Sequence, residues 1–152
     1  MASSVVRFEA RMVIHHPADV VFDRLADLPD YRRWMHRTGL FRRCGLTSEA
    51  PVRQGTTYSD ATWMGTYQGE VTEFVRPSRI AFSEGLHWFG SGTAQARAEY
   101  TLEGDDNETV VHHVAVGELH GWMRVMKPAA ALMAKSERSR TLSSLRRSLE
   151  SE

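Results

Sequence analysis

Apolar and polar side chains alternate through residues 5–14, which is the period-two pattern of a strand with one face in water. Pro17 suits the first turn of a helix, and apolar residues follow it at helical spacing as far as Leu28. Pro29 ends this helix, because proline cannot continue the backbone hydrogen bonding, and we expect a second short helix through residues 30–35. The chain therefore opens with a strand and two short helices.

The middle of the chain changes to short runs of β-branched and aromatic residues, separated by turns rich in Gly, Pro and Asp. Nothing between these runs is long enough for the helix of a parallel crossover, so we expect antiparallel pairing. The six expected strands are residues 40–48, 56–64, 66–76, 79–86, 93–103 and 109–118. Residues 122–149 are rich in Ala, Leu, Met and Arg and predict a long helix, which Pro128 either kinks or begins.

These elements predict one α+β domain over residues 1–152. A seven-stranded, curved antiparallel sheet surrounds a long C-terminal helix, in the order β-α-α-β-β-β-β-β-β-α. Small residues line both expected walls, with Ala96 and its neighbours on one strand and several alanines around Leu132 and Met133 on the helix. Such residues either leave a cavity for an apolar ligand or let the helix approach the sheet more closely, and composition does not separate these readings.

Composition limits the partners. The chain has 19 basic and 19 acidic residues, and this zero net charge argues against a nucleic-acid partner. A single cysteine, Cys44, allows no internal disulfide and no paired-cysteine redox motif. Charges near residue 7 interrupt any hydrophobic core of a signal peptide, and no run approaches the roughly 20 apolar residues of a membrane span. We therefore expect a cytoplasmic protein without integral membrane association, either a monomer or a homodimer.

Candidate catalytic groups are few. The sequence carries no zinc-protease, nucleophile-elbow, phosphate-loop or dinucleotide motif, so we expect no metal and no cofactor. Glu84 shares a strand face with Ile80 and Phe82, and it could project into the cavity as a general acid or base. Either His112 or His113 could also face inward, but not both, because neighbours on a strand point to opposite faces. The alternative for all three is a solvated carboxylate and ordinary hydrogen-bonded histidines.

Aromatic residues gather where a hairpin connection is expected. Trp88 and Phe89 lie in the segment 85–92, which we expect to be this connection, and large aromatic side chains in loops usually contact a ligand or a partner. We expect this hairpin to form the mouth of the cavity, with His87 or Tyr67 donating an orienting hydrogen bond. Alternatively, the loop folds back and plugs its own pocket. The full set of expected ligand-binding residues is Trp63, Tyr67, Glu84, His87, Trp88, Phe89, Ala96, Leu132 and Met133.

Arginine outnumbers lysine 17 to 2 and clusters in residues 32–43 and 138–147. The second cluster is interleaved with serines and glutamates, which is typical of a solvated helix face.

Four segments carry a resemblance to a known family. Residues 16–22 and 27–34 resemble the opening of the polyketide cyclase/dehydrase and START-like proteins, the SRPBCC superfamily. Residues 69–82 are similar to that family's pair of strands joined at a proline and arginine turn, and residues 100–111 are similar to its next hairpin. The resemblance implies the helix-grip fold, with a hydrophobic cavity between sheet and C-terminal helix. It implies no particular reaction, because shared fold does not determine function.

Three functions are compatible with these observations. The first is binding or carrying a small hydrophobic ligand, such as a lipid, an isoprenoid or a polyketide-like compound, in the internal cavity. The second is a polyketide cyclase, aromatase or dehydrase in which Glu84 or a histidine moves protons during ring closure. The third is a protein-interaction module of the co-chaperone kind, in which the aromatic hairpin contacts a partner.

Overall fold

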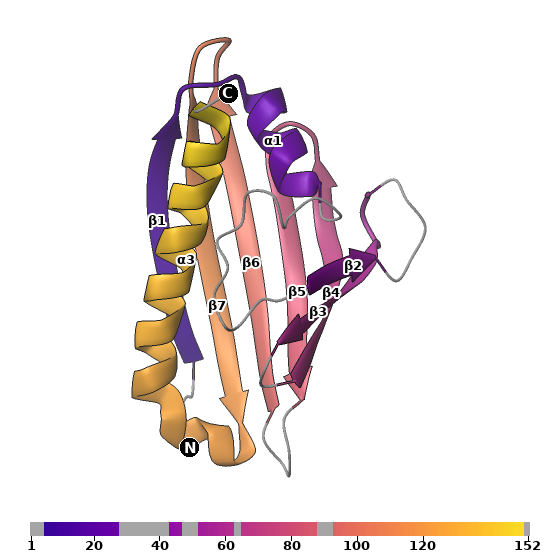
Figure 1. Ribbon diagram of the computed structural model, residues 1–152, viewed down its shortest axis with the longest axis vertical. Helices are drawn as coiled ribbons and strands as arrows, with labels where there is room; N and C mark the ends of the chain where they lie inside the picture. Colours follow the sequence, from indigo (N-terminus) through magenta and orange to yellow (C-terminus); the bar gives the residue numbers. More distant parts are fainter. Residues whose placement is uncertain (1–4, 28–42, 47–51, 63–64, 88–92, 151–152) are drawn as a thin grey trace.

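The computed structural model describes residues 5–27, 43–46, 52–62, 65–87 and 93–150. Within them, strands pair into one antiparallel sheet of seven in the order β1-β7-β6-β5-β4-β3-β2 (Figure 1). The strands are β1 (Val5–Ile14), β2 (Arg43–Leu46), β3 (Thr57–Thr62), β4 (Gly65–Val75), β5 (Arg79–His87), β6 (Thr93–Gly104) and β7 (Thr109–His120). The helices are α1 (Ala18–Ala26), the 3-10 helix η2 (Gly121–Met126) and α3 (Lys127–Glu150).

The two α-helices, α1 and α3, cover the same face of the sheet, which we call the inner face. The long helix α3 runs along β1 in front of the sheet, and α1 lies across the ends of β5 and β6 (Figure 1). The C-terminal half of α3 buries Leu142, Leu145 and Leu149. They join inner-face residues of α1 and the strands in one hydrophobic core. Removal of this apolar surface from water is the main stabilising contribution to the fold.

Alternation along the strands assigns each side chain to a face. On β5, Ile80 and Phe82 are buried on the inner face, and the exposed Ser83 lies on the outer face. On the outer face, Arg79 forms ion pairs with Glu73 and Glu99, at 3.3 Å for the second. The sequence pattern of β4 loses its phase because a bulge between Val71 and Glu73 inserts one residue into the ladder.

The expected α+β class is confirmed, and a long C-terminal helix packed on one antiparallel sheet is consistent with the expected helix-grip fold. The expected helix through residues 30–35 lies outside the described residues, as does part of the expected strand 40–48. The C-terminal helix begins at Lys127 rather than at residue 122, because Gly121–Met126 form the 3-10 helix η2. Pro128 lies in the first turn of α3, where its missing N–H has no intrahelical acceptor to lose, so it begins the helix instead of kinking it.

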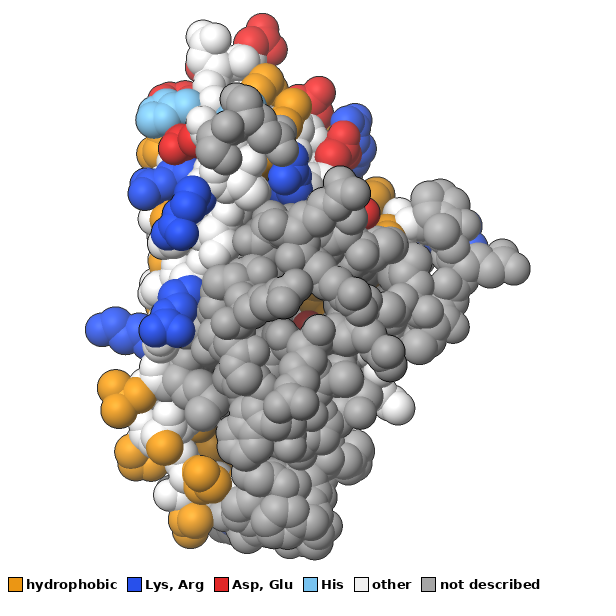
Figure 2. Space-filling model, viewed as in Figure 1, with side chains coloured by type: hydrophobic (Ala, Val, Ile, Leu, Met, Phe, Trp, Pro, Cys, Tyr) orange, Lys and Arg blue, Asp and Glu red, His pale blue; other side chains and the backbone are white. Residues whose placement is uncertain are grey.

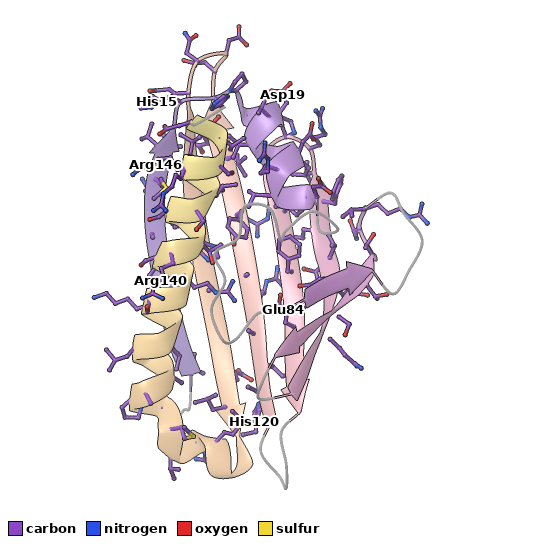
Figure 3. The ribbon with its side chains drawn as sticks, viewed as in Figure 1. His15, Asp19, Glu84, His120, Arg140 and Arg146 are labelled. Atoms are coloured by element: carbon purple, nitrogen blue, oxygen red, sulfur yellow. The ribbon has the colours of Figure 1, made fainter. Side chains whose placement is uncertain are left out.

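The C-terminal turn of α3 is tied to the residue that follows β1. Glu150 at the end of α3 accepts a hydrogen bond from the backbone N–H of His15 at 3.1 Å, and its Oε1 lies 2.8 Å from Nδ1 of the same histidine. Figure 3 shows His15 beside the C-terminal turn of α3. These contacts lower the pKa of the Glu150 carboxyl, with the backbone hydrogen bond the largest cause.

In the described residues no helix is long and apolar enough to cross a membrane.

Candidate ligand-binding site

Small residues occupy the centre of the inner face. The strand register places inner-face residues of β5, β6 and β7 side by side in rows. From α1 toward η2 these rows are Ile80–Tyr100–His113, Phe82–Ala98–Ala115 and Glu84–Ala96–Gly117. We call the small residues of the last two rows, together with Ala94, the floor: Ala94, Ala96, Ala98, Ala115 and Gly117. A floor of this kind has almost no side-chain volume above the sheet.

Solvent exposure differs along the floor. Ala98 and Ala115 are buried, whereas Ala94 and Ala96 are half-buried although they lie on the inner face. The half-buried end is the one near η2, which packs against the ends of β6 and β7. The covering layer is therefore incomplete above Ala94 and Ala96.

A carboxylate stands at one side of the floor. Glu84 lies in the middle of the sheet on the face that α3 crosses (Figure 3), and its Oε1 accepts a hydrogen bond of 2.6 Å from the hydroxyl of Tyr58. The Tyr58 ring reaches this position by lying over Gly69, since a Cβ on that glycine would be 2.3 Å from Tyr58 Cζ. Gly69 pairs with both residues in the ladder, so one glycine makes the contact possible.

An imidazole and a phenol form the opposite side. The rings of His113 and Tyr100 stack with their centroids 4.2 Å apart, and both side chains are buried. Nδ1 of His113 lies 3.0 Å from the backbone carbonyl oxygen of Glu99. A carbonyl only accepts, so Nδ1 carries the proton and Nε2 of the neutral ring is an acceptor. Within the described part of the chain, this buried Nε2 has no hydrogen-bond partner.

Burial keeps this histidine neutral. Loss of hydration, together with the positive charge of Arg138, lowers the pKa of His113 to about 3. Burial likewise raises the pKa of Tyr100, while the Arg138 guanidinium, which hydrogen-bonds to it, opposes that rise. The negative charge of Glu84 also acts on Tyr100. Glu84, Tyr100, His113 and Arg138 thus form one interacting polar group around the floor.

A separate hollow of about 670 Å³ lies on the sheet. Most of its lining belongs to the outer face, and the lining residues are Thr57, Tyr58, Ser59, Gln68, Gly69, Glu70, Ser83, Glu84, Gly85 and Gln95. Its polar character differs from the apolar interior cavity that the sequence predicts. Among the described residues, no group of three or more His, Cys, Asp or Glu side chains could hold a metal ion.

The structure places some of the expected site residues on the inner face and others away from it. Glu84 and Ala96 lie next to each other on the inner face. His113 is the inward histidine, because His112 lies on the outer face with its Nε2 2.6 Å from Glu9 Oε1. Leu132 is 72% exposed, so the expectation that it lines the interior is wrong: this face of α3 points away from the sheet.

The other expected residues stay predictions. Trp63, Trp88 and Phe89 lie outside the described residues. The side chains of Tyr67, His87 and Met133 also fall outside the described part, although their backbone belongs to β4, β5 and α3.

Three polar side chains around the floor were not expected from the sequence. Arg138 was expected on a solvated helix face, but it is half-buried and acts on Tyr100 and His113. Its helical spacing from Leu142, Leu145 and Leu149 places it on the buried face and could have revealed it. Tyr100 could have been found from its position on the alternating face of Ala96 and Ala98. Tyr58 had no comparable signal.

Comparisons with known proteins agree on the fold. A START superfamily protein from Mycobacterium smegmatis is similar in structure, with a TM-score of 0.75, 10% sequence identity and coverage of 95% of this chain and 97% of that one. A conserved protein from Geobacillus kaustophilus gives a TM-score of 0.71 at 15% identity, with 96% of each chain covered.

A third solved structure, an uncharacterised protein from Rhizobium leguminosarum, gives a TM-score of 0.63 at 18% identity over the whole of both chains. No curated protein sequence matches this chain. The family model described as "Polyketide cyclase / dehydrase and lipid transport" matches residues 5–150. With nearly its whole length matched, the chain belongs to the polyketide cyclase / dehydrase and lipid transport family.

Proposed function

We propose that the protein binds a small, mainly hydrophobic molecule on the floor, between the sheet and the layer that covers it. The observation that carries the proposal is the half-buried state of Ala94 and Ala96 on the inner face, in a domain whose neighbouring inner residues are buried. Family membership supports the same function class. Affinity comes from burial of apolar ligand surface, at about 25 cal/mol per Å².

The polar groups beside the floor give the ligand an orientation. His113 Nε2 is a buried acceptor, and leaving such an atom unpaired costs about 1–3 kcal/mol. A hydroxyl or N–H group on the ligand would satisfy it. We therefore propose a ligand with an apolar body and at least one hydrogen-bond donor, the pattern of most small-molecule sites.

Cyclisation and dehydration of a polyketide-like chain is the second candidate. The observation that favours it is the Glu84 carboxylate, held by the Tyr58 hydroxyl in the same row as the half-buried Ala96. Glu84 would accept the proton from a carbon next to a ligand carbonyl. His113 is a weak candidate for this step, because a group with a pKa of about 3 has little proton affinity at neutral pH.

Probe binding tests the proposal. A neutral naphthylamine fluorophore is titrated into the wild-type protein and into Ala96→Leu, which fills the space above the floor. The matched control, Gln95→Leu, places the same side chain on the outer face of the same strand. We expect Ala96→Leu to weaken binding by about tenfold, the usual cost of overfilling a site, and Gln95→Leu to leave it unchanged.

The opposite pattern would refute the proposal. If Gln95→Leu weakens binding and Ala96→Leu does not, the probe occupies the outer-face hollow. Turnover of a polyketide-like substrate separates the two candidate functions. Glu84→Gln abolishes this turnover if Glu84 moves a proton. Unchanged turnover in the variant removes Glu84 from the mechanism. Native mass spectrometry of protein from its own host addresses the protein-interaction alternative, which predicts no bound small molecule.

A further inference from the structure

Large apolar side chains are exposed where η2 meets α3. Val125 is 82% exposed, Leu132 is 72% exposed and Met126 is 38% exposed. Figure 2 shows hydrophobic side chains gathered at the lower left of the molecule, where α3 begins, with Lys and Arg side chains further along the helix. We call these three residues the apolar tip. Exposed hydrophobic residues grouped in this way mark interaction surfaces more often than isolated ones do.

Three basic residues lie in the same segment as the apolar tip. Arg124, Lys127 and Lys135 are all exposed and lie within the same short segment. Residues 121–136 contain no Asp or Glu, although the whole chain has zero net charge. Both lysines of the chain fall in this segment.

We propose that the apolar tip and its three cations dock on the surface of an anionic lipid membrane. In such a complex the apolar side chains enter the boundary between lipid head groups and acyl chains. The charged ends of the lysine and arginine side chains stay beside the lipid phosphates. Charge complementarity favours this occupant over a second copy of the chain, because two copies would bring the same cations together. The association is peripheral and adds no membrane-spanning segment.

The apolar tip lies at the end of the sheet where the floor is half-buried. η2 packs against the ends of β6 and β7, at the same end of the sheet as the half-buried Ala94 and Ala96. A membrane at this end would be the nearest source or destination for an apolar molecule on the floor. The docking itself does not depend on the interior ligand, and the two proposals are tested by different variants.

Vesicle co-sedimentation tests the docking. The full chain is mixed with vesicles of phosphatidylcholine alone and with vesicles that also contain phosphatidylglycerol. We expect binding to the anionic vesicles that weakens with added salt. The double variant Val125→Ser with Leu132→Ser should lose at least about tenfold in partitioning. Lys135→Gln should lose about fivefold, since each cation near an anionic surface contributes about 1 kcal/mol.

Matched controls lie on the outer face of the sheet. Val75→Ser removes a valine that is 55% exposed, and Arg11→Gln removes an exposed cation of β1. Both should bind vesicles as the wild type does, and circular dichroism should show all variants folded. The proposal is overturned if the wild type ignores anionic vesicles or if the tip variants bind unchanged. A dimer in light scattering that the double variant dissociates would instead identify a second copy as the occupant.

Discussion

The imidazole ring of His113 lies on the phenol ring of Tyr100, with centroids 4.2 Å apart and ring planes 14° from parallel. The two residues are direct partners in the β6–β7 ladder, so the sheet register itself sets this stacking. Together with the contact from Nδ1 to the Glu99 carbonyl, it fixes both the orientation and the tautomer of the histidine. A neutral, buried acceptor therefore faces the protein interior.

Acid should destabilise the protein through His113. Its pKa is about 3 in the folded protein and about 6.5 in the unfolded chain, so the unfolded state binds more protons between these values. The stability that the neutral ring provides is complete above pH 6.5 and is lost as the pH falls. We expect the free energy of unfolding to decrease by about 2 kcal/mol between pH 7 and pH 5, measured by urea denaturation.

The control for this pH dependence is His113→Phe, which keeps an aromatic ring on Tyr100 but cannot titrate. Its free energy of unfolding should change much less over the same interval, because the phenyl ring binds no proton in either state. Identical slopes in the two proteins would show that His113 is protonated without difficulty in the folded state.

The Tyr58–Glu84 hydrogen bond should be measurable as a coupling energy. Tyr58→Phe and Glu84→Gln each break the bond of 2.6 Å or weaken its charge-assisted character. Because Glu84 is half-buried and reaches some water, we expect a coupling of about 1 kcal/mol in a double-mutant cycle of unfolding free energies. Strictly additive effects would mean that the two side chains act independently.

Gly69 should tolerate no side chain. A methyl group there meets the Tyr58 ring at 2.3 Å, so Gly69→Ala must displace the tyrosine and should cost about 2 kcal/mol of stability. Gly85→Ala is the matched control, because nothing lies within 4 Å of a Cβ at that position. Thermal unfolding distinguishes the two. In a Tyr58→Ala background the cost at Gly69 should disappear, and a persistent cost would assign it to the backbone instead.

Two leucines of α3 should differ sharply. Leu145 is fully buried in the core, and Leu145→Ala should lower the free energy of unfolding by about 2–5 kcal/mol. Leu132→Ala, on the same helix, should change it by less than about 0.5 kcal/mol because the side chain is exposed. Chemical denaturation of both variants measures which face of α3 packs on the sheet, and similar losses would contradict the described orientation.

Most of the fold follows from local patterns, whereas the site depends on long-range register. The alternation in residues 5–14 and the turns between later strands predict the strands, and both signals are local. Glu84 could be placed on the inner face for the same reason. Tyr58 could not be connected to Glu84, because that contact requires the β3–β4–β5 register and a glycine between them. Leu132 was misplaced because a helix rich in alanine gives no clear apolar face.

In the proposed function an apolar molecule occupies the space above Ala96 and reaches His113. A crystal structure of the protein purified from its own host would show this molecule. We expect electron density for a bound molecule, or an open void, in contact with Ala96, and a donor of that molecule near Nε2 of His113. An interior in which side chains of α3 or of the covering layer pack directly on Ala96 and Ala115 would contradict it.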